Sequence, residues 1–210
     1  MVQKVVVATH NAGKLTEIAR IIGETVEGSQ FEFVTSGQLD LPDPVEDGTT
    51  FEANALIKAR DAASRTGLPA LADDSGLIVD VMGMAPGILS ARWSGRHGDD
   101  AANNALLLAQ LSDIPDEERT ARFRCAAALV IPAQVSTDGQ AHEYVQVCDM
   151  EGVLLCEERG DNGFGYDPLF VPHNQEGSLT SAEMTAQEKN AISHRGKALR
   201  AIAQYFHDLV

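Results

Sequence analysis

The chain has 210 residues, and its 31 Asp and Glu side chains against 16 Lys and Arg give a formal charge of −15. This balance excludes a general nucleic-acid binder and a protein that docks on anionic membranes, because both need a basic surface. Three cysteines without a C-x-x-C pair are typical of a reduced, cytoplasmic protein. No signal peptide or membrane span is expected, since no run reaches about 18 apolar residues.

The N-terminal third alternates strand-like and helix-like hydrophobic patterns. In chain order we expect a strand at 2–8, a helix at 11–24, a strand at 31–35 and a helix at 49–66. Thr49 or Thr50 is the expected N-cap of the second helix, and Gly67 its stop. Extended structure is then expected in two pieces, 70–73 and 77–82, separated by a break at 74–76.

In the rest of the chain the sequence pattern predicts a loop, a helix, a long hairpin and a final helix. The expected ranges are 83–98 for the loop, 99–112 for the helix, 120–131 and 142–151 for the paired strands, 132–141 for their connection and 153–156 for a further strand. A capping box, Thr185 with Glu188, opens the final helix. The order predicts an α/β fold with a mixed sheet. The length suits a single domain over residues 1–210, or two closely joined lobes.

The first motif, Thr-His-Asn-Ala-Gly-Lys at residues 9–14, joins the first strand to the first helix. It is not a Walker A loop, because Leu15 follows Lys14. The Thr9 hydroxyl, the Asn11 amide and the Lys14 cation nevertheless suit a phosphate at a helix start. The alternative is an ordinary strand-to-helix turn with an Asn cap.

The second motif, Leu-Ala-Asp-Asp-Ser-Gly at residues 71–76, places two carboxylates side by side on a strand. Adjacent strand residues face opposite sides, so at most one of the pair points into a given site. Mg²⁺ uses one or two carboxylates plus phosphate oxygens, whereas a bare carboxylate repels a polyphosphate. The alternative is a solvated Asp-Ser-Gly turn.

Two further segments carry polar side chains next to these motifs. Glu46 precedes a helix. It is either a second metal ligand or simply a favourable negative charge at a helix N-terminus. Asn54, Lys58 and Arg60 extend a polar helix face toward a ligand, or form a solvated face.

The last motifs lie in the C-terminal third. The glycine-rich stretch at 160–168 carries two aromatic rings that can stack on a base or fill a core. Lys189, His194 and Arg195 supply cations and hydrogen-bond donors, although each alone also suits a helix end or a surface position.

Together these pieces resemble the non-canonical purine nucleoside triphosphate pyrophosphatases, the dITP/XTP or inosine triphosphate pyrophosphatase family. The matching segments, in chain order, are THNAGK, EDGTTFEANALIKAR, LADDSGL, APGILSARWSG, ARFRC, GFGYDPLF and EKNAISHRGKAL. The chain departs from the family pattern at Ala53, where F-x-E-N-A has Glu, and at His10, where a small residue is common. The connection at 132–141 is also longer than usual.

The resemblance implies an α/β fold with an elongated mixed β-sheet, flanking helices and two lobes around a central cleft. It implies hydrolysis of ITP, dITP and XTP at the α–β phosphate bond to the nucleoside monophosphate and pyrophosphate, which cleanses the nucleotide pool. It also implies a Mg²⁺ cofactor and a homodimer.

The matching motifs also imply roles for individual residues. Asp74 is the implied general base and a metal ligand, Glu46 is a second metal candidate, and Asp73 is the second choice for either role of Asp74. The implied substrate-binding residues are Thr9, His10, Asn11, Ala12, Gly13, Lys14, Ser75, Phe164, Gly165, Tyr166, Asp167, Lys189, His194 and Arg195.

Two alternatives stay open at this point. One is a pyrophosphatase for other modified nucleotides, and the other is a non-catalytic purine nucleotide sensor. The acidic pair argues against the sensor, because a pure anion site gains nothing from carboxylates without a metal. A donor at His194 or Arg195 toward the purine oxo group favours hypoxanthine and xanthine over adenine.

Overall fold

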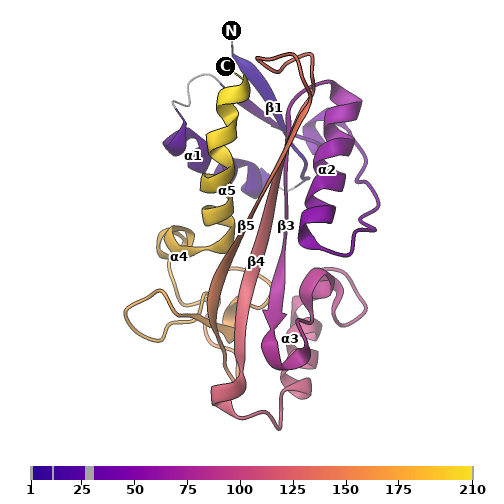
Figure 1. Cartoon of the computed structure of the whole chain (residues 1–210). Coiled ribbons are helices and arrows are strands. Elements are labelled where there is room, and N and C mark those ends of the chain that lie inside the picture. The colour runs from indigo at the N-terminus through magenta and orange to yellow at the C-terminus, as the bar shows by residue number, and fades with distance from the viewer. Residues whose placement is uncertain (1, 11, 27–30, 210) are drawn as a thin grey trace. The chain divides into compact units, whose positions relative to one another are not determined.

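The computed structural model describes residues 2–10, 12–26 and 31–209 (Figure 1). The chain divides into two compact units. The first unit comprises Met1–Asp74, Cys125–Cys148 and Arg195–Val210, and the second comprises Ser75–Arg124 and Asp149–His194. Three long strands contribute residues to both units: β3 (Ala70–Val79), β4 (Thr120–Ile131) and β5 (His142–Leu154).

Within the described residues, six strands form one mixed sheet in the order β2-β1-β3-β4-β5-β6. The other strands are β1 (Gln3–Val7), β2 (Phe31–Thr35) and β6 (Phe170–Pro172). Strand β1 pairs in parallel with both β2 and β3, whereas β5 and β6 are antiparallel. The predicted α/β fold with a mixed sheet is therefore confirmed.

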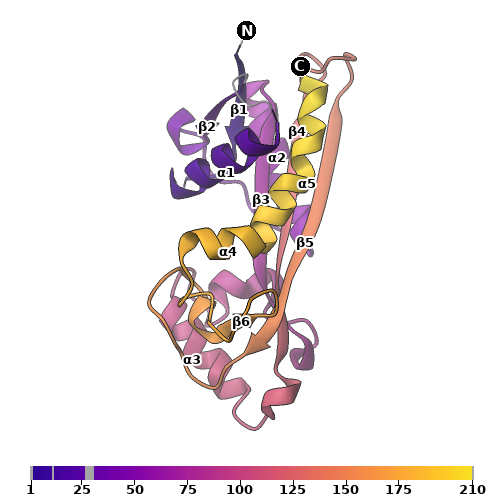
Figure 2. The same ribbon diagram turned by 90° about the vertical axis from the view of Figure 1, so that its left-hand side faces the viewer.

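The core of the first unit lies between strands and two amphipathic helices, α1 (Ala12–Thr25) and α5 (His194–Ala203) (Figure 2). Ile18, Ile21 and Ile22 recur at helical spacing on α1 and are fully buried. They share one cluster with residues of β1, β4 and α5, including Val5, Leu129 and Leu199. Helix α2 (Phe51–Thr66) begins at Thr50, whose hydroxyl accepts the Ala53 N–H, and ends at Gly67 with φ 68°.

The core of the second unit includes residues of helix α3 (Asp100–Gln110) and residues of the long strands β3, β4 and β5 that belong to this unit. Leu77, Leu107 and Phe170 are completely buried in it, and the Phe123 ring packs edge-on against Phe170 at 4.8 Å. Helix α4 (Ala186–Ile192) opens with the predicted capping box, in which Thr185 and Glu188 bond reciprocally.

Two predicted boundaries are wrong. Strand β3 runs without a break through residues 74–76, because pairing within the sheet overrides the turn preference of Ser and Gly. Strand β5 continues to Leu154, so the separate strand predicted at 153–156 is absent from the described residues.

Three other segments differ from the predicted elements in detail. The predicted final helix is divided at Ser193, whose ψ of 146° is extended and ends α4 before α5 begins. Residues at 80–82 form a 3-10 helix instead of continuing the strand, and Gly87–Arg92 forms another inside the predicted loop.

None of the described helices combines the length and the apolar character that a membrane crossing requires. The single domain over residues 1–210, the elongated shape and the central cleft stay predictions.

Candidate functional site

The first motif begins where β1 ends. The Thr9 carbonyl accepts the Ser36 hydroxyl at 2.9 Å, which ties this turn to the segment after β2. Asn11 lies outside the described residues, and of Ala12 only its place at the start of α1 is described. Gly13 and Lys14 follow in the first turn of α1, so the motif does open a helix as predicted.

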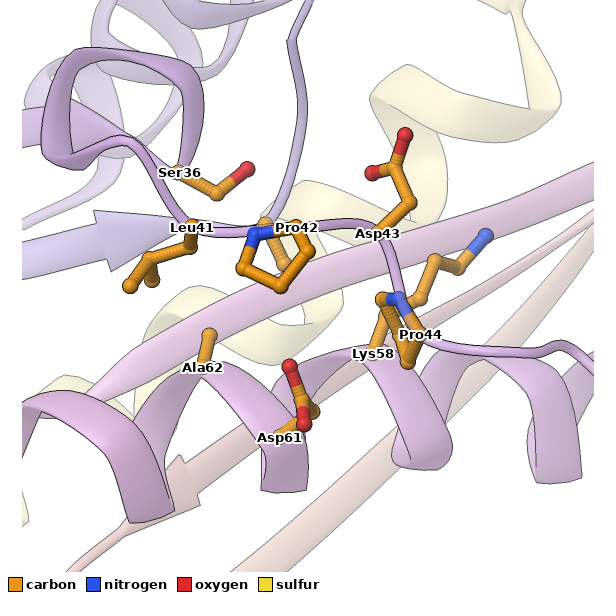
Figure 3. Close-up of a pocket in the computed structure, with 9 residues that line it drawn as sticks. Ser36, Leu41, Pro42, Asp43, Pro44, Lys58, Asp61 and Ala62 are labelled. Atoms are coloured by element: carbon orange, nitrogen blue, oxygen red, sulfur yellow. The ribbon is translucent and has the colours of Figure 1, made fainter.

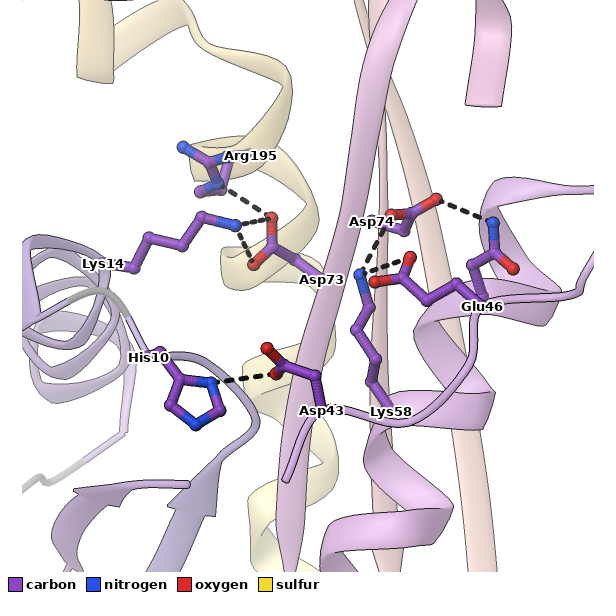
Figure 4. A network of polar contacts seen from close by, with 9 residues as sticks. His10, Lys14, Asp43, Glu46, Lys58, Asp73, Asp74 and Arg195 are labelled. Carbon is purple, nitrogen blue, oxygen red and sulfur yellow. Dashed lines mark hydrogen bonds and ion pairs between the residues drawn. The ribbon is translucent and has the colours of Figure 1, made fainter. Parts of the chain in front are cut away.

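Asp73 is a buried carboxylate held by two cations of the first unit (Figure 4). The Lys14 Nζ lies 3.2 and 3.3 Å from its two oxygens, and Arg195 Nε donates to it at 3.1 Å. Burial alone would raise the pKa of Asp73, but the charges of Lys14 and Arg195 outweigh it and hold the pKa far below the ordinary value. Asp73 is therefore a permanent anion.

Asp74 faces the other side of β3, as the strand alternation predicts (Figure 4). Lys58 Nζ donates to its Oδ1 at 3.0 Å, and Asn54 Nδ2 donates to its Oδ2 at 3.4 Å. Burial raises the pKa of Asp74 to about 6, with a further increase from Glu46 and an opposing effect of Lys58. A carboxylate with this pKa can accept a proton near neutral pH.

Glu46 and Asp74 share one cation. Lys58 Nζ lies 3.2 Å from Glu46 Oε2 as well as 3.0 Å from Asp74. Burial lowers the pKa of Lys58, but the two carboxylates outweigh this and raise it. The ammonium of Lys58 therefore stays charged between two carboxylates.

These residues fit a Mg²⁺ ion that is completed by substrate. Mg²⁺ is usually held by one or two protein carboxylates, with phosphate oxygens and waters at the remaining positions. Across the described part of the chain, no three His, Cys, Asp or Glu side chains form a ready-made metal group. The nearby Asn54 Oδ1 is buried, and within that part of the chain it accepts no hydrogen bond. The donor set is therefore suited to a metal that binds together with a phosphate.

His10 connects the first motif to the loop that follows β2. Its Nδ1 lies 2.9 Å from Asp43 Oδ1 (Figure 4), and its Nε2 lies 3.0 Å from the Leu41 carbonyl. A pocket of about 10 Å³ lies next to this loop (Figure 3), lined by Ala8, Ser36, Leu41, Pro42, Asp43, Pro44, Lys58, Asp61 and Ala62. It holds about one water molecule and is too small for a nucleotide.

In the second unit, the glycine-rich loop exposes one aromatic ring. The Phe164 side chain is 63% exposed, and Lys189 Nζ lies 5.2 Å from its centroid. Asp167 Oδ2 accepts both the Phe164 N–H at 2.9 Å and the Lys189 ammonium at 2.5 Å. An exposed ring beside a cation is a suitable surface for a base.

Other predicted residues of the second unit are buried or half-buried. Tyr166 lies in the core and its hydroxyl donates to the Ser90 carbonyl at 2.8 Å. The His194 ring stacks on Phe123 at 5.1 Å. Ser75 is half-buried on β3, directly after Asp74.

The structure thus brings together two groups of predicted residues. In the first unit these are Lys14, Asp73 and Arg195 on one side of β3, and Glu46 and Asp74 on the other; in the second unit they are Phe164, Asp167 and Lys189. The role of each residue stays a prediction. Arg60 does not join either group, because it pairs with Glu143 at the surface.

Sequence reasoning placed Asn54 and Lys58 on a polar helix face that extends toward a ligand, but it did not connect them with Asp74. Both contact the same carboxylate, that of Asp74. Their four-residue spacing was the available signal, because positions i and i+4 lie on one face of a helix.

Comparison with known proteins agrees with this architecture. Residues 5–205 match the model of the Ham1 family. A dITP/XTP pyrophosphatase of Bifidobacterium longum subsp. infantis is 57% identical, over 95% of this chain and 96% of that protein. A solved HAM1 protein from Coxiella burnetii is 38% identical with a TM-score of 0.85, over 98% of both chains. A solved nucleoside-triphosphatase / dITP/XTP pyrophosphatase from Mycobacterium abscessus is 50% identical with a TM-score of 0.76, over 95% of this chain and 97% of that chain. The chain therefore belongs to the Ham1 family.

Proposed function

We propose that this protein hydrolyses non-canonical purine nucleoside triphosphates (ITP, dITP and XTP) to the nucleoside monophosphate and pyrophosphate. The name of a relative that is 57% identical over nearly the whole chain supports this activity. The observation that carries the chemistry is the Asp74 carboxylate, held by Lys58 and Asn54 next to Glu46. Removal of such triphosphates cleanses the nucleotide pool.

The reaction is the attack of a water molecule on the α–β phosphoanhydride. The water oxygen bonds to phosphorus, the bond to the bridging oxygen breaks, and pyrophosphate leaves with the electron pair. Asp74 accepts the proton of the water, because a pKa of about 6 leaves it ionised at neutral pH while keeping it basic. Lys58 holds Asp74 in place and, with Lys14, supplies positive charge for the triphosphate.

Mg²⁺ belongs to this proposal. Glu46 and Asp74 would hold it, and when bound it neutralises charge on the phosphate oxygens. The local cations and the metal explain how a protein of net charge −15 can bind a polyanion, because the attraction acts at the site and not over the whole surface.

Recognition of the base is assigned to Phe164, Lys189, His194 and Arg195. The exposed Phe164 ring stacks on the purine, and Lys189 adds positive charge at its edge. His194 and Arg195 remain the proposed donors to the purine oxo group, which adenine lacks.

Three further features complete the proposal. The protein is a homodimer, a state that rests on the family resemblance. It is cytoplasmic, which the three cysteines in thiol form support. It has no nucleic-acid or membrane partner, in keeping with its acidic charge.

The test is pyrophosphate release from ITP, XTP, GTP and ATP, each with Mg²⁺ and with EDTA. Metal-dependent release from ITP and XTP far above that from GTP and ATP is the expected result. Release from other modified nucleotides alone would point to a different pyrophosphatase. Tight ITP binding without any release would favour a sensor.

A further inference from the structure

Helix α3 holds both polar groups of one residue in the glycine-rich loop. Asp100 Oδ2 accepts the Gly165 N–H at 2.7 Å, and Asn104 Nδ2 donates to the Gly165 carbonyl at 3.1 Å. Asp100 and Asn104 are four residues apart, so their side chains leave α3 on the same face. The backbone of Gly165 is therefore fixed from one side by two side chains of a single helix.

The two clamping side chains differ in how they are held. Asn104 is 3% exposed and also donates to Glu158 Oε1 at 2.9 Å, so its amide has one orientation. Asp100 lies in the first turn of α3, where a carboxylate is stabilised by the helix N-terminus. Its bond to Gly165 involves a charged acceptor, which makes it stronger than a neutral hydrogen bond.

The clamped residue lies between two aromatic side chains with opposite exposures. Phe164 is 63% exposed, whereas Tyr166 is 4% exposed and bonded to Ser90. Gly165 has φ 63°, a left-handed backbone conformation, and it lies between the exposed Phe164 and the buried Tyr166. The two peptide groups on either side of Gly165, one carrying its N–H and the other its carbonyl, therefore set the direction in which the Phe164 ring leaves the loop.

We propose that Asp100 and Asn104 are positioning residues that fix the Gly165 backbone and thereby present the Phe164 ring to the purine base. This inference rests on the proposed function, because it assumes that Phe164 contacts the base. Asp167, which accepts the Phe164 N–H at 2.9 Å, restrains the same loop. Together the three side chains restrain the Phe164 N–H and both backbone polar groups of Gly165.

A clamp of this kind acts on base binding and not on the bond-breaking step. Loss of the charged Asp100 bond is expected to weaken base binding about tenfold, on the scale of one charge-assisted hydrogen bond. KM for ITP rises by this factor while kcat is unchanged, because ground state and transition state lose the same contact. Binding of pyrophosphate, which has no base, is unaffected.

The experiment compares full-length Asp100→Ala, Asn104→Ala and Asp100→Asn with the unmodified protein. Calorimetry measures binding of inosine monophosphate and of pyrophosphate, steady-state kinetics measures ITP hydrolysis, and amide hydrogen exchange measures protection of Gly165. Asp100→Ala is expected to speed Gly165 exchange and to weaken inosine monophosphate about tenfold. Asp100→Asn keeps an acceptor oxygen, so it is expected to retain most of the Gly165 protection and most of the affinity for inosine monophosphate.

Asp99→Ala is the matched control. Asp99 caps α3 by accepting the Ala102 N–H at 3.2 Å and makes no bond to Gly165, so its loss weakens the helix without removing the clamp. Its stability is expected to fall, with inosine monophosphate binding retained.

Several outcomes would overturn the inference. These are unchanged inosine monophosphate binding in Asp100→Ala, equal losses for inosine monophosphate and pyrophosphate, or the same base-specific loss in Asp99→Ala. Failure of the proposed function looks different, because the unmodified protein then releases no pyrophosphate from ITP. The binding and exchange measurements do not depend on turnover and still decide the role of the clamp.

Discussion

Asp73 and Asp74 are neighbours on β3, yet one is paired with Lys14 and Arg195 while the other contacts Lys58. The alternation of a strand places their carboxylates on opposite sides. The first has its pKa held far below the ordinary value, and the second has its pKa raised to about 6. Two identical side chains thus become a fixed anion and a group that can exchange protons.

Asp74→Asn is expected to abolish turnover of ITP and to leave substrate binding largely intact. The amide keeps the size of the side chain and a hydrogen-bond acceptor for Lys58, but it cannot take a proton from water. Pyrophosphate release measures the first effect, and calorimetry with ITP measures the second. Full activity of the variant would remove Asp74 from the mechanism.

The same substitution is expected to change how the stability of the metal-free protein depends on pH. The pKa of Asp74 is raised from 3.8 to about 6 in the fold, so its contribution to stability is present below pH 3.8 and lost as pH rises through 6. Asn does not titrate. Between pH 4 and pH 7 the free energy of unfolding of the variant should therefore rise relative to that of the unmodified protein. The expected rise is on the order of 3 kcal/mol, at about 1.4 kcal/mol per pKa unit. Urea unfolding in EDTA measures this gain, and a constant difference would contradict it.

Asp73→Asn is expected to change the pH dependence of stability in the opposite direction. The pKa of Asp73 is depressed, so its contribution to stability is present above the unfolded value of 3.8 and lost only as pH falls through its lower folded value. At pH 7 the variant takes away the charged carboxylate that accepts from the buried Arg195 at 3.1 Å, which costs about 3 kcal/mol, while the ion pair of Arg195 with Glu17 at 3.6 Å remains. Urea unfolding at pH 7 should show this loss, and the difference should narrow only below about pH 4.

Gly48→Ala is expected to reduce both stability and turnover. A Cβ at this position would lie 2.5 Å from Asn54 Oδ1 and 2.8 Å from Ala53 Cβ, so the Asn54 amide, which donates to Asp74, must shift from its position. Such overpacking costs roughly 1–3 kcal/mol. Urea unfolding and pyrophosphate release measure the two effects.

Gly23→Ala is the control for this substitution. A Cβ at Gly23 meets no described atom within 4 Å, and the residue lies inside α1. Alanine there should stabilise the helix by roughly 0.5–1 kcal/mol. If both variants gave the same change in stability, the contact with Asn54 would have no part in the effect.

Arg195→Ala is expected to erode the preference for ITP over ATP more than the affinity for the triphosphate. The structure adds a second expected effect, because Arg195 is buried and donates to Asp73 at 3.1 Å. Its loss should lower stability by about 3 kcal/mol. The ratio of kcat/KM for ITP and ATP should therefore be measured well below the melting temperature of the variant, and an unchanged ratio would exclude a role in base choice.

Local signals in the sequence predicted most element positions. The Thr50 cap, the Gly67 stop and the Thr185–Glu188 capping box all depend on bonds within a few residues, and all are found in the structure. The break at 74–76 was wrong because the neighbouring strands that hold β3 straight are distant in sequence. β6 was missed because its three residues carry too little pattern to be seen.

The same distinction applies to the candidate site. The motifs located the acidic pair and the cations, and strand alternation separated Asp73 from Asp74. Which cation meets which carboxylate depends on pairs such as Asp73 with Arg195, which are 122 positions apart. The clamp on Gly165 by Asp100 also joins distant segments, so no local pattern could predict it.

The division of the last helical segment at Ser193 constrains how this chain can vary in length. Lys189 pairs with Asp167 in the second unit, and six residues later Arg195 pairs with Asp73 in the first. An insertion or deletion between them would move one cation away from its carboxylate. The connection at 132–141 is mostly exposed, and its contacts include the Asp138–His142 ion pair at 2.9 Å and the Thr137 N–H bond to the Asp208 carbonyl at 3.0 Å, neither of which involves a candidate site residue. Natural length differences among close relatives should therefore accumulate at that connection and be absent between positions 189 and 195.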